Sequence, residues 1–361
     1  MLLNRESYRT LLKILTFFGL WDEISVKQKR FTFKVPIIIT ILCGLIIALS
    51  LLQIDEFEKI LEVFEITPMI IFVIISTFNF IYTKENLKNL LGIIDQIEEE
   101  NCEISVVIDE ACKLIKKLFT AFTILLTFVL INHTFCPFVF GKLNFPVYTP
   151  EILNDSQFMF YAPWLLHSIV AIYCGITNLA LQGFRYSLLI IIDYVIQYFR
   201  QKLNNSNSDV DLIKCVKLHL HIKELIEKYA EIYLALFYAF LFSSTIMVVS
   251  LVFIIINSET RLKSHAFSIV YVIFLLFQIF MPCCCGSLIE QQSKEFVYDL
   301  FSSDWRDIDT KHKKKMIFIM ENMKKTIQLR AFGFDAINLE FFFQVLKIVY
   351  SMYAVLQSMK D

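Results

Sequence analysis

Seven long stretches of the chain are apolar and almost free of charge. Six of them contain no Asp, Glu, Lys or Arg, and the seventh contains one charged residue, Lys347. Each stretch is long enough to cross a hydrocarbon core of about 30 Å as an α-helix. The pattern therefore predicts an all-α membrane protein with seven spans, at residues 35–54, 66–83, 118–141, 156–184, 232–258, 266–289 and 341–359.

Lysine and arginine are distributed unevenly between the segments that join these spans. The N-terminal tail and the second, fourth and sixth connecting segments hold 28 of the 34 basic residues, and the remaining connecting segments and the C-terminal tail hold five. Basic residues favour the cytoplasmic side of membrane helices. We therefore predict a cytoplasmic N-terminus and an extracellular C-terminus, which is the reverse of the orientation of a G-protein-coupled receptor.

Apolar periodicity continues past the ends of several spans, into segments predicted to be cytosolic. Beyond Arg185, for example, apolar residues recur every three or four positions. Such stripes need packing partners outside the membrane, so we expect an intracellular bundle of helical extensions. The expected helices cover residues 164–203, 212–256 and a basic segment at 310–330, and residues 84–117 extend the second and third spans.

These features divide the chain into four consecutive parts. Residues 1–34 form a short cytoplasmic tail, and residues 35–289 hold the first six spans with their cytosolic extensions. Residues 290–333 form an intracellular anchor segment, and residues 334–361 hold the last span and a short outer tail. We expect a ligand-binding region in the outer half of the second part.

The last span carries a polar face that becomes apolar at its outer end. Its residues recur every three or four positions and so share one side of a helix. They are Glu340, Gln344, Lys347, Ser351, Val355 and Met359. A charge in mid-span costs at least about 2.5–3.5 kcal/mol if it faces lipid. This face therefore either lines a pore with a hydrophobic gate, built from several copies, or carries a lysine that snorkels to the interface.

Isolated polar and aromatic groups occur at similar depth in the outer halves of the second, third, fourth and sixth spans. Small-molecule sites are mostly apolar with a few directional polar groups, so these residues are candidates for a ligand chamber. Each residue taken alone is better explained by ordinary packing or by a hydrogen bond between helices. The candidates are Phe72, Val73, His133, Thr134, Trp164, His167, Ala171, Tyr271 and Phe274.

Other chemistry finds little support in the sequence. It contains no HExxH, GxSxG or Walker motif, so we expect no enzyme. The basic residues fit membrane topology and contact with lipid headgroups, and they do not indicate nucleic-acid binding.

Asn154 is a candidate glycosylation site in the predicted outer loop. Cys283, Cys284 and Cys285 suit apolar packing or palmitoylation. Three neighbours on a helix cannot all face one ion, so we expect no metal or other cofactor.

Three segments stand out in the last 80 residues. They are residues 285–293 (Cys-Gly-Ser-Leu-Ile-Glu-Gln-Gln-Ser), residues 298–305, which begin with a Tyr and end with a Trp, and residues 334–356. The first resembles the segment that closes the sixth span in the insect odorant receptors, specifically their ligand-tuning subunits. The second resembles the Tyr and Trp element of that family, with a longer spacing, and the third closely resembles its final helix. Over the rest of the chain the resemblance lies in topology and loop lengths.

This resemblance implies a fold of seven helices with a split seventh, and four subunits that assemble through an intracellular anchor around a central cation pore. The final helix would line that pore, with Val355 and Met359 at its outer gate, although Met359 replaces the usual Leu. Volatile ligands would bind between the second, third, fourth and sixth helices. Tuning subunits generally work with a common co-receptor, Orco, in the plasma membrane of sensory neurons.

We therefore expect a subunit of an odorant-gated cation channel. A gustatory receptor of the same superfamily is the nearest alternative, although its tail would carry a different signature. A metabotropic receptor would need the opposite orientation in the membrane. A transporter would show internal repeats or broken helices in matching halves, and the sequence contains no such repeat.

Overall fold

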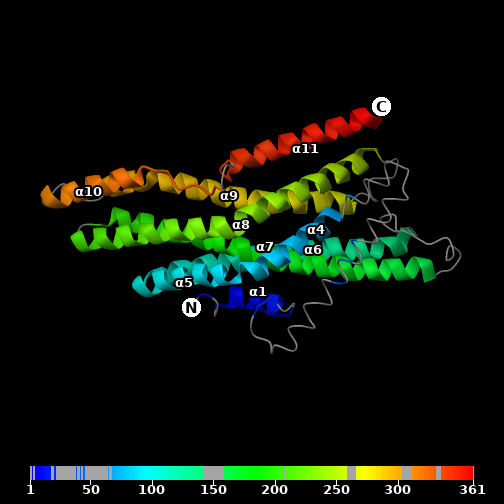
Figure 1. The fold of residues 1–361 in the computed structure, drawn as a ribbon, viewed down its shortest axis with the longest axis horizontal. Helices are drawn as coiled ribbons and strands as arrows, with labels where there is room; N and C mark the ends of the chain where they lie inside the picture. Colours follow the sequence, from blue (N-terminus) through cyan, green and yellow to red (C-terminus); the bar gives the residue numbers. More distant parts are fainter. Residues whose placement is uncertain are drawn as a thin grey trace.

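In a computed structural model of the chain, long helices lie side by side along one axis (Figure 1). The structure describes residues 5–17, 20–21, 67–140, 158–206, 208–257, 266–302, 310–330 and 335–360, with isolated positions 2, 38, 41, 44 and 64. No strand occurs among these residues. The helices are α1 (Glu6–Phe17), α4 (Thr67–Tyr82), α5 (Lys84–Glu100), α6 (Ile104–Phe140), α7 (Phe158–Asn204), α8 (Asp209–Asn257), α9 (Ala266–Ser302), α10 (Thr310–Met323) and α11 (Leu339–Lys360).

Most of the predicted membrane spans coincide with long apolar helices. Five of the described helices are long and apolar enough to cross a membrane, and the bent pair α4–α5 provides a sixth if it counts as one span. These helices cover the predicted spans two to seven, apart from a few end residues. The first predicted span lies almost entirely outside the described residues, as does the candidate glycosylation site Asn154. The predicted all-α membrane fold is confirmed.

The long helices extend well beyond the predicted membrane segments. α7 contains 47 residues and α8 contains 49, so the continuous helices predicted over residues 164–203 and 212–256 are confirmed. At 1.5 Å per residue, α8 is about 70 Å long, more than twice the thickness of a hydrocarbon core. The parts that extend past the membrane segments of α7, α8 and α9 pack together with α5 and α10 (Figure 1).

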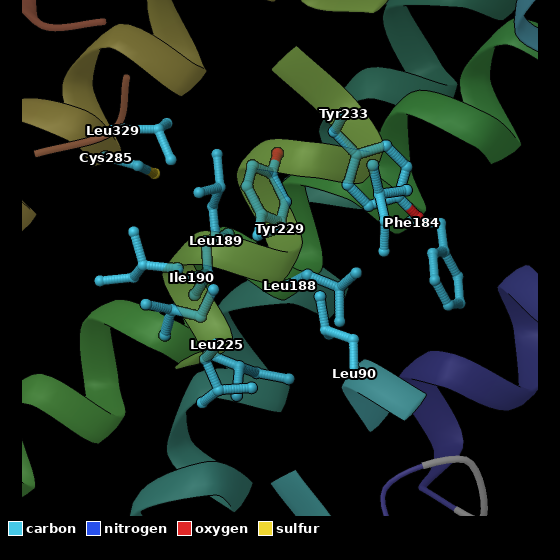
Figure 2. Packing of buried hydrophobic residues seen from close by; sticks show 14 of the residues in the cluster. Leu90, Phe184, Leu188, Leu189, Ile190, Leu225, Tyr229, Tyr233, Cys285 and Leu329 are labelled. Atoms are coloured by element: carbon cyan, nitrogen blue, oxygen red, sulfur yellow. The ribbon is translucent and has the colours of Figure 1, made fainter. Parts of the chain in front are cut away.

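α7 forms the centre of the bundle, where it contacts α1, α4, α6, α8 and α9. All side chains of residues 184–193 are buried. A helix that is enclosed on every side must be apolar almost all round, and this segment is dominated by Leu and Ile. Figure 2 shows Leu188 and Leu189 packed among side chains from neighbouring helices, such as Leu90 of α5 and Tyr229 of α8.

α10 is shorter than the sequence predicted, since it ends at Met323 and not at residue 330. The following residues run along α9 without helical structure. The amide of Ile327 donates to Ser293 Oγ over 3.0 Å, and the Ser293 hydroxyl donates to the Ile327 carbonyl over 3.3 Å. A serine on α9 thus satisfies backbone groups that a longer helix would have paired internally. Apolar periodicity carries no information about such a partner.

α11 begins against α9 at a contact that only glycine permits. A Cβ atom on Gly286 would lie 1.9 Å from the carbonyl oxygen of Ile337. That distance is far shorter than any van der Waals contact, and the obstacle is backbone and not a mobile side chain. The lack of a side chain at Gly286 therefore lets the chain that leads into α11 lie directly on α9.

Hydrogen bonds beside this contact fix the first turn of α11. Ser287 Oγ of α9 accepts a hydrogen bond of 2.8 Å from the amide of Leu339. Asn338 caps the helix, because its Oδ1 accepts from the amide of Phe341 over 3.0 Å. The Asn338 side chain also donates to Glu290 Oε2 of α9 over 3.3 Å. The segment 285–293, singled out in the sequence, is thus the strip of α9 on which α11 starts.

Gly286→Ala should displace the start of α11, because the added methyl group would overlap the Ile337 backbone. We expect a loss of stability of about 1–3 kcal/mol or more, measured as a lower thermal midpoint of the purified protein and lower surface expression. Gly92→Ala in α5 is the matched control, since a Cβ there meets nothing within 4 Å. Wild-type stability of Gly286→Ala would show that the junction is packed differently.

Candidate functional site

An apolar cluster rich in aromatic rings fills the space between α6, α7 and α9. We call it the aromatic cluster. The Phe122 ring of α6 lies 6.1 Å from that of Phe274 on α9 and 6.3 Å from that of Tyr186 on α7. Aromatic walls of this kind suit small apolar molecules. The buried members of the cluster are Phe122, Leu126, Leu179, Tyr186 and Phe274.

A small cavity adjoins the aromatic cluster and shares Phe122, Leu179 and Tyr186 with it. Its volume is about 20 Å³, which is room for about one water molecule. Its walls also include the side chains of Gln182 on α7 and Gln278 on α9. The site in this conformation therefore offers only a space of atomic size, with two amides among apolar neighbours.

A tyrosine compensates for a proline at the edge of this cavity. Pro282 lies inside α9 and has no amide hydrogen, so the carbonyl of Gln278 lacks its usual partner four residues on. The Tyr186 hydroxyl of α7 donates to that carbonyl over 2.8 Å. A buried carbonyl without a partner is costly. This bond therefore ties α7 to α9 where the ladder of α9 is interrupted.

The predicted ligand-binding residues fall into separate places. Phe274 belongs to the aromatic cluster, and Tyr271 packs against its edge. Phe72 and Val73 of α4 are almost completely buried in a different apolar cluster. There the Phe72 ring lies 5.1 Å from the ring of Phe240 in α8. The structure thus joins the candidates of α9 with α6 and α7, and it places those of α4 against α7 and α8.

The remaining candidates lie nearer the ends of α6 and α7 that the sequence places outside. Trp164 Nε1 of α7 donates to the backbone carbonyl of Thr134 in α6 over 2.9 Å. The Thr134 hydroxyl donates to a carbonyl of its own helix over 2.7 Å. Ala171 is half-buried on α7. The side chains of His133 and His167 lie outside the described residues.

Arg185 is a buried residue whose place the sequence reasoning missed. It lies just beyond the predicted fourth span, residues 156–184, yet it is only 5% exposed. Its Nη2 donates to Ser76 Oγ of α4 over 2.7 Å. The guanidinium also lies 5.7 Å from the Phe72 ring and 5.9 Å from the Tyr233 ring. A buried cation needs such partners, so Arg185 links α4, α7 and α8.

α11 is held to the rest of the chain along one side. It contacts α8 and α9, and the side chain of Val345 is buried on that side. Near its end, the Asn257 amide of α8 donates to Gln357 Oε1 over 3.0 Å. Only 6% of the α11 span is buried, compared with 89% of the α7 span. Within the part of a single chain that the structure describes, most of α11 therefore has no protein around it.

The predicted pore residues all lie on the open side of α11. Gln344, Lys347, Ser351, Val355 and Met359 are exposed in the single chain. A membrane span with a lysine near its middle on an open face requires water, lipid headgroups or another chain beside that face. The exposure is compatible with both the pore and the snorkelling interpretation of Lys347.

One helix connects the two regions. α9 carries Phe274 in the aromatic cluster and Gly286 at the start of α11. The 12 residue steps from Phe274 to Gly286 correspond to about 18 Å along a helix axis. The aromatic cluster and the start of α11 are therefore joined by one helix, which carries Pro282 between them.

Comparison with known proteins identifies the family. Residues 56–350 match the profile of the seven-transmembrane odorant receptors. The chain belongs to this family. The resemblance to insect odorant receptors that the last 80 residues indicated is thereby confirmed, and the family is one of receptors and not of enzymes.

The curated relatives are distant. Odorant receptor 33a of Drosophila melanogaster is 22% identical over 160 residues, which cover 44% of this chain and 42% of that receptor. Odorant receptor 85a of the same species is 21% identical over 233 residues, which cover 61% of this chain and 57% of that receptor. The chain thus spans about half the length of the curated relatives that it matches.

Solved structures show the same fold over almost the whole chain. The insect olfactory receptor OR5 from Machilis hrabei in complex with eugenol has a TM-score of 0.84 at 14% identity, covering 97% of this chain and 98% of that receptor. A second structure of OR5 has a TM-score of 0.80 at 14% identity, covering 96% and 97%. At this identity the likeness establishes the architecture of an insect odorant receptor.

Tyr186→Phe should destabilise the protein by about 1–3 kcal/mol, because it leaves the Gln278 carbonyl buried without a donor. The measurement is the thermal midpoint of the purified protein. The cost should shrink in a Pro282→Ala background, where the alanine amide supplies the missing donor. Equal costs in both backgrounds would mean that the hydroxyl does not compensate for the proline.

Proposed function

We propose that the chain is the ligand-tuning subunit of an odorant-gated cation channel, in the plasma membrane of sensory neurons. The observation that supports this most is the arrangement of α9 and α11. The polar stripe of α11 ends in two apolar residues, Val355 and Met359, and this face of the helix is open to solvent or to other chains. It starts on the same helix, α9, that lines the aromatic cluster.

The odorant site in this proposal is the space of the aromatic cluster, which lies nearer the predicted cytoplasmic ends of α6 and α7 than the outer-half chamber expected from the sequence. Phe274 and Tyr271 form the α9 wall, and Trp164 bridges α6 and α7 toward the outer end. Because the adjoining cavity is only about 20 Å³, a volatile molecule has to separate the rings to enter. OR5, which has the same fold, was solved in complex with the small molecule eugenol, which supports a ligand site within this architecture.

Gating follows from the mechanical connection between the site and α11. A ligand that binds better to the open arrangement shifts the equilibrium toward it. Movement of α9 at the aromatic cluster reaches α11 through the contact of Gly286 with the Ile337 carbonyl. Among the described residues, the Asn257–Gln357 bond holds the outer end of α11 to α8. In this proposal that end moves away from α8 when the channel opens.

The pore in this proposal is made by α11 helices of several subunits around an axis, because one helix cannot enclose a path. Gln344, Lys347 and Ser351 line the inner part, and Val355 and Met359 form the hydrophobic gate. The partner chains are the Orco co-receptor, and cations permeate. The basic residues of the connecting segments support the proposed orientation, with the N-terminus in the cytoplasm, the C-terminus outside and Asn154 available for glycosylation.

Val355→Ala or Met359→Ala should raise the basal current or alter ion selectivity, because a smaller side chain widens the hydrophobic gate and lets water enter it. Whole-cell recording of the chain with Orco, across an odorant panel, is the measurement. Tyr350→Ala is the matched control, since Tyr350 is 73% exposed on α11 but lies at least about 140° around the helix from Val355 and Met359. Unchanged currents in both gate variants at normal surface expression would exclude α11 as a pore helix.

Odorant-evoked current should persist when G-protein signalling is blocked, because the receptor is itself a channel subunit in this proposal. Loss of current under the block would favour a metabotropic receptor.

An epitope tag placed after Asp361 should be reached by antibody in intact cells. A tag placed before Met1 should be reached only after permeabilisation. The opposite labelling would contradict the proposed orientation.

A further inference from the structure

The cavity beside the aromatic cluster contains two amide groups that lack hydrogen-bond partners. Gln182 is 4% exposed and Gln278 is 1% exposed. Among the described residues, Gln182 Nε2 and Gln278 Oε1 have no partner. Both side chains line the cavity, one from α7 and the other from α9. Two helices thus bring unsatisfied polar groups to the same small space.

Leaving such groups unpaired is unfavourable. A buried polar group without a partner costs about 1–3 kcal/mol, and apolar side chains at both positions would remove that cost. The other polar side chains of the wall are already engaged: the Ser187 hydroxyl donates to the Phe184 carbonyl and the Tyr186 hydroxyl to the Gln278 carbonyl. The two amides are therefore the groups of this cavity that remain available to an incoming molecule.

The chemistry of the pair specifies what fits. Each amide offers a donor and an acceptor. A ligand group between them can therefore pair with both amides if it accepts one hydrogen bond and donates another. A hydroxyl group does so with a single oxygen atom. The cavity volume of about 20 Å³ accommodates one group of that size.

We propose that this cavity is a subsite for the hydroxyl group of the ligand, and that the receptor recognises small apolar molecules with one hydroxyl, namely alcohols or phenols. The apolar body of the ligand lies in the aromatic cluster, which shares Phe122, Leu179 and Tyr186 with the cavity. The hydroxyl accepts from Gln182 and donates to Gln278. This inference rests on the proposed function and specifies its ligand class.

Related polar groups satisfy the subsite less well. An ether or ketone oxygen accepts a hydrogen bond but donates none, so one amide stays unpaired. A carboxylate or ammonium group brings a charge into a cavity whose described lining contains no charged side chain, which costs more than a neutral group. A hydrocarbon leaves both amides unpaired unless a water molecule stays behind.

The experiment compares matched ligands on the chain co-expressed with Orco. The probes are 1-hexanol, 1-octanol and 4-ethylphenol, each with its methyl ether and its parent hydrocarbon, and a separate set of esters of similar size. In the wild type we expect the hydroxyl compound to act at concentrations at least about tenfold lower than its ether and hydrocarbon. In Gln182→Leu and in Gln278→Leu this preference should fall to about threefold or less.

Asn178→Leu provides the matched control. Asn178 lies on α7 and is 2% exposed, but it does not line the cavity. Removal of this buried amide should leave the hydroxyl preference unchanged. If a leucine variant fails to reach the cell surface, Gln182→Met and Gln278→Met, which keep the side-chain length, replace it.

Three outcomes overturn the inference while the proposed function stands. They are equal potency of alcohols and their ethers in the wild type, a preference retained in both glutamine variants, and responses to esters alone. A preference retained in both variants would assign the cavity to a structural water. Silence to every class of odorant, in a complex that reaches the surface, would instead contradict the proposed function itself.

Discussion

The backbone contact between Gly286 of α9 and the carbonyl of Ile337 determines where α11 lies. Among the described residues, α11 otherwise contacts the chain along one side, through α8 and α9. At its start, a single missing Cβ lets one backbone rest on another, and hydrogen bonds that Ser287 and Asn338 accept from backbone amides fix the direction of the first turn. With a side chain at that position, α11 and its polar stripe would have to move away from the bundle.

The same helix combines three features that depend on one another. α9 carries Phe274 in the aromatic cluster, Pro282 in the interrupted part of its hydrogen-bond ladder, and Gly286 at the junction with α11. Tyr186 of α7 holds α9 where the proline weakens it. α7, whose middle part is buried, thus supports a neighbour, α9, that connects the aromatic cluster to the exposed helix α11. Under the proposed function, the ligand site and the conducting path are therefore different surfaces.

Periodicity and charge predicted the long helices correctly, because a membrane span must be apolar and a packed extension must be striped. They failed where backbone groups pair with a side chain from a distant part of the sequence. α10 ends at Met323 because Ser293 pairs with the backbone of Ile327. Depth along a span also does not define which way a residue faces. Phe72 and Phe274 were grouped by depth, yet they belong to clusters on different sides of α7.

The sequence by itself determined which segments are apolar enough to cross a membrane, where basic residues accumulate, and that the last span has a polar stripe. These properties depend on the composition and spacing of neighbouring residues. Only the tertiary structure decided that Arg185 meets Ser76, that Tyr186 meets the carbonyl of Gln278, and that Gln182 and Gln278 share a cavity. Each of these pairs joins residues about a hundred positions apart, and the rotation of each helix about its axis, which brings them together, is fixed by packing and not by local pattern.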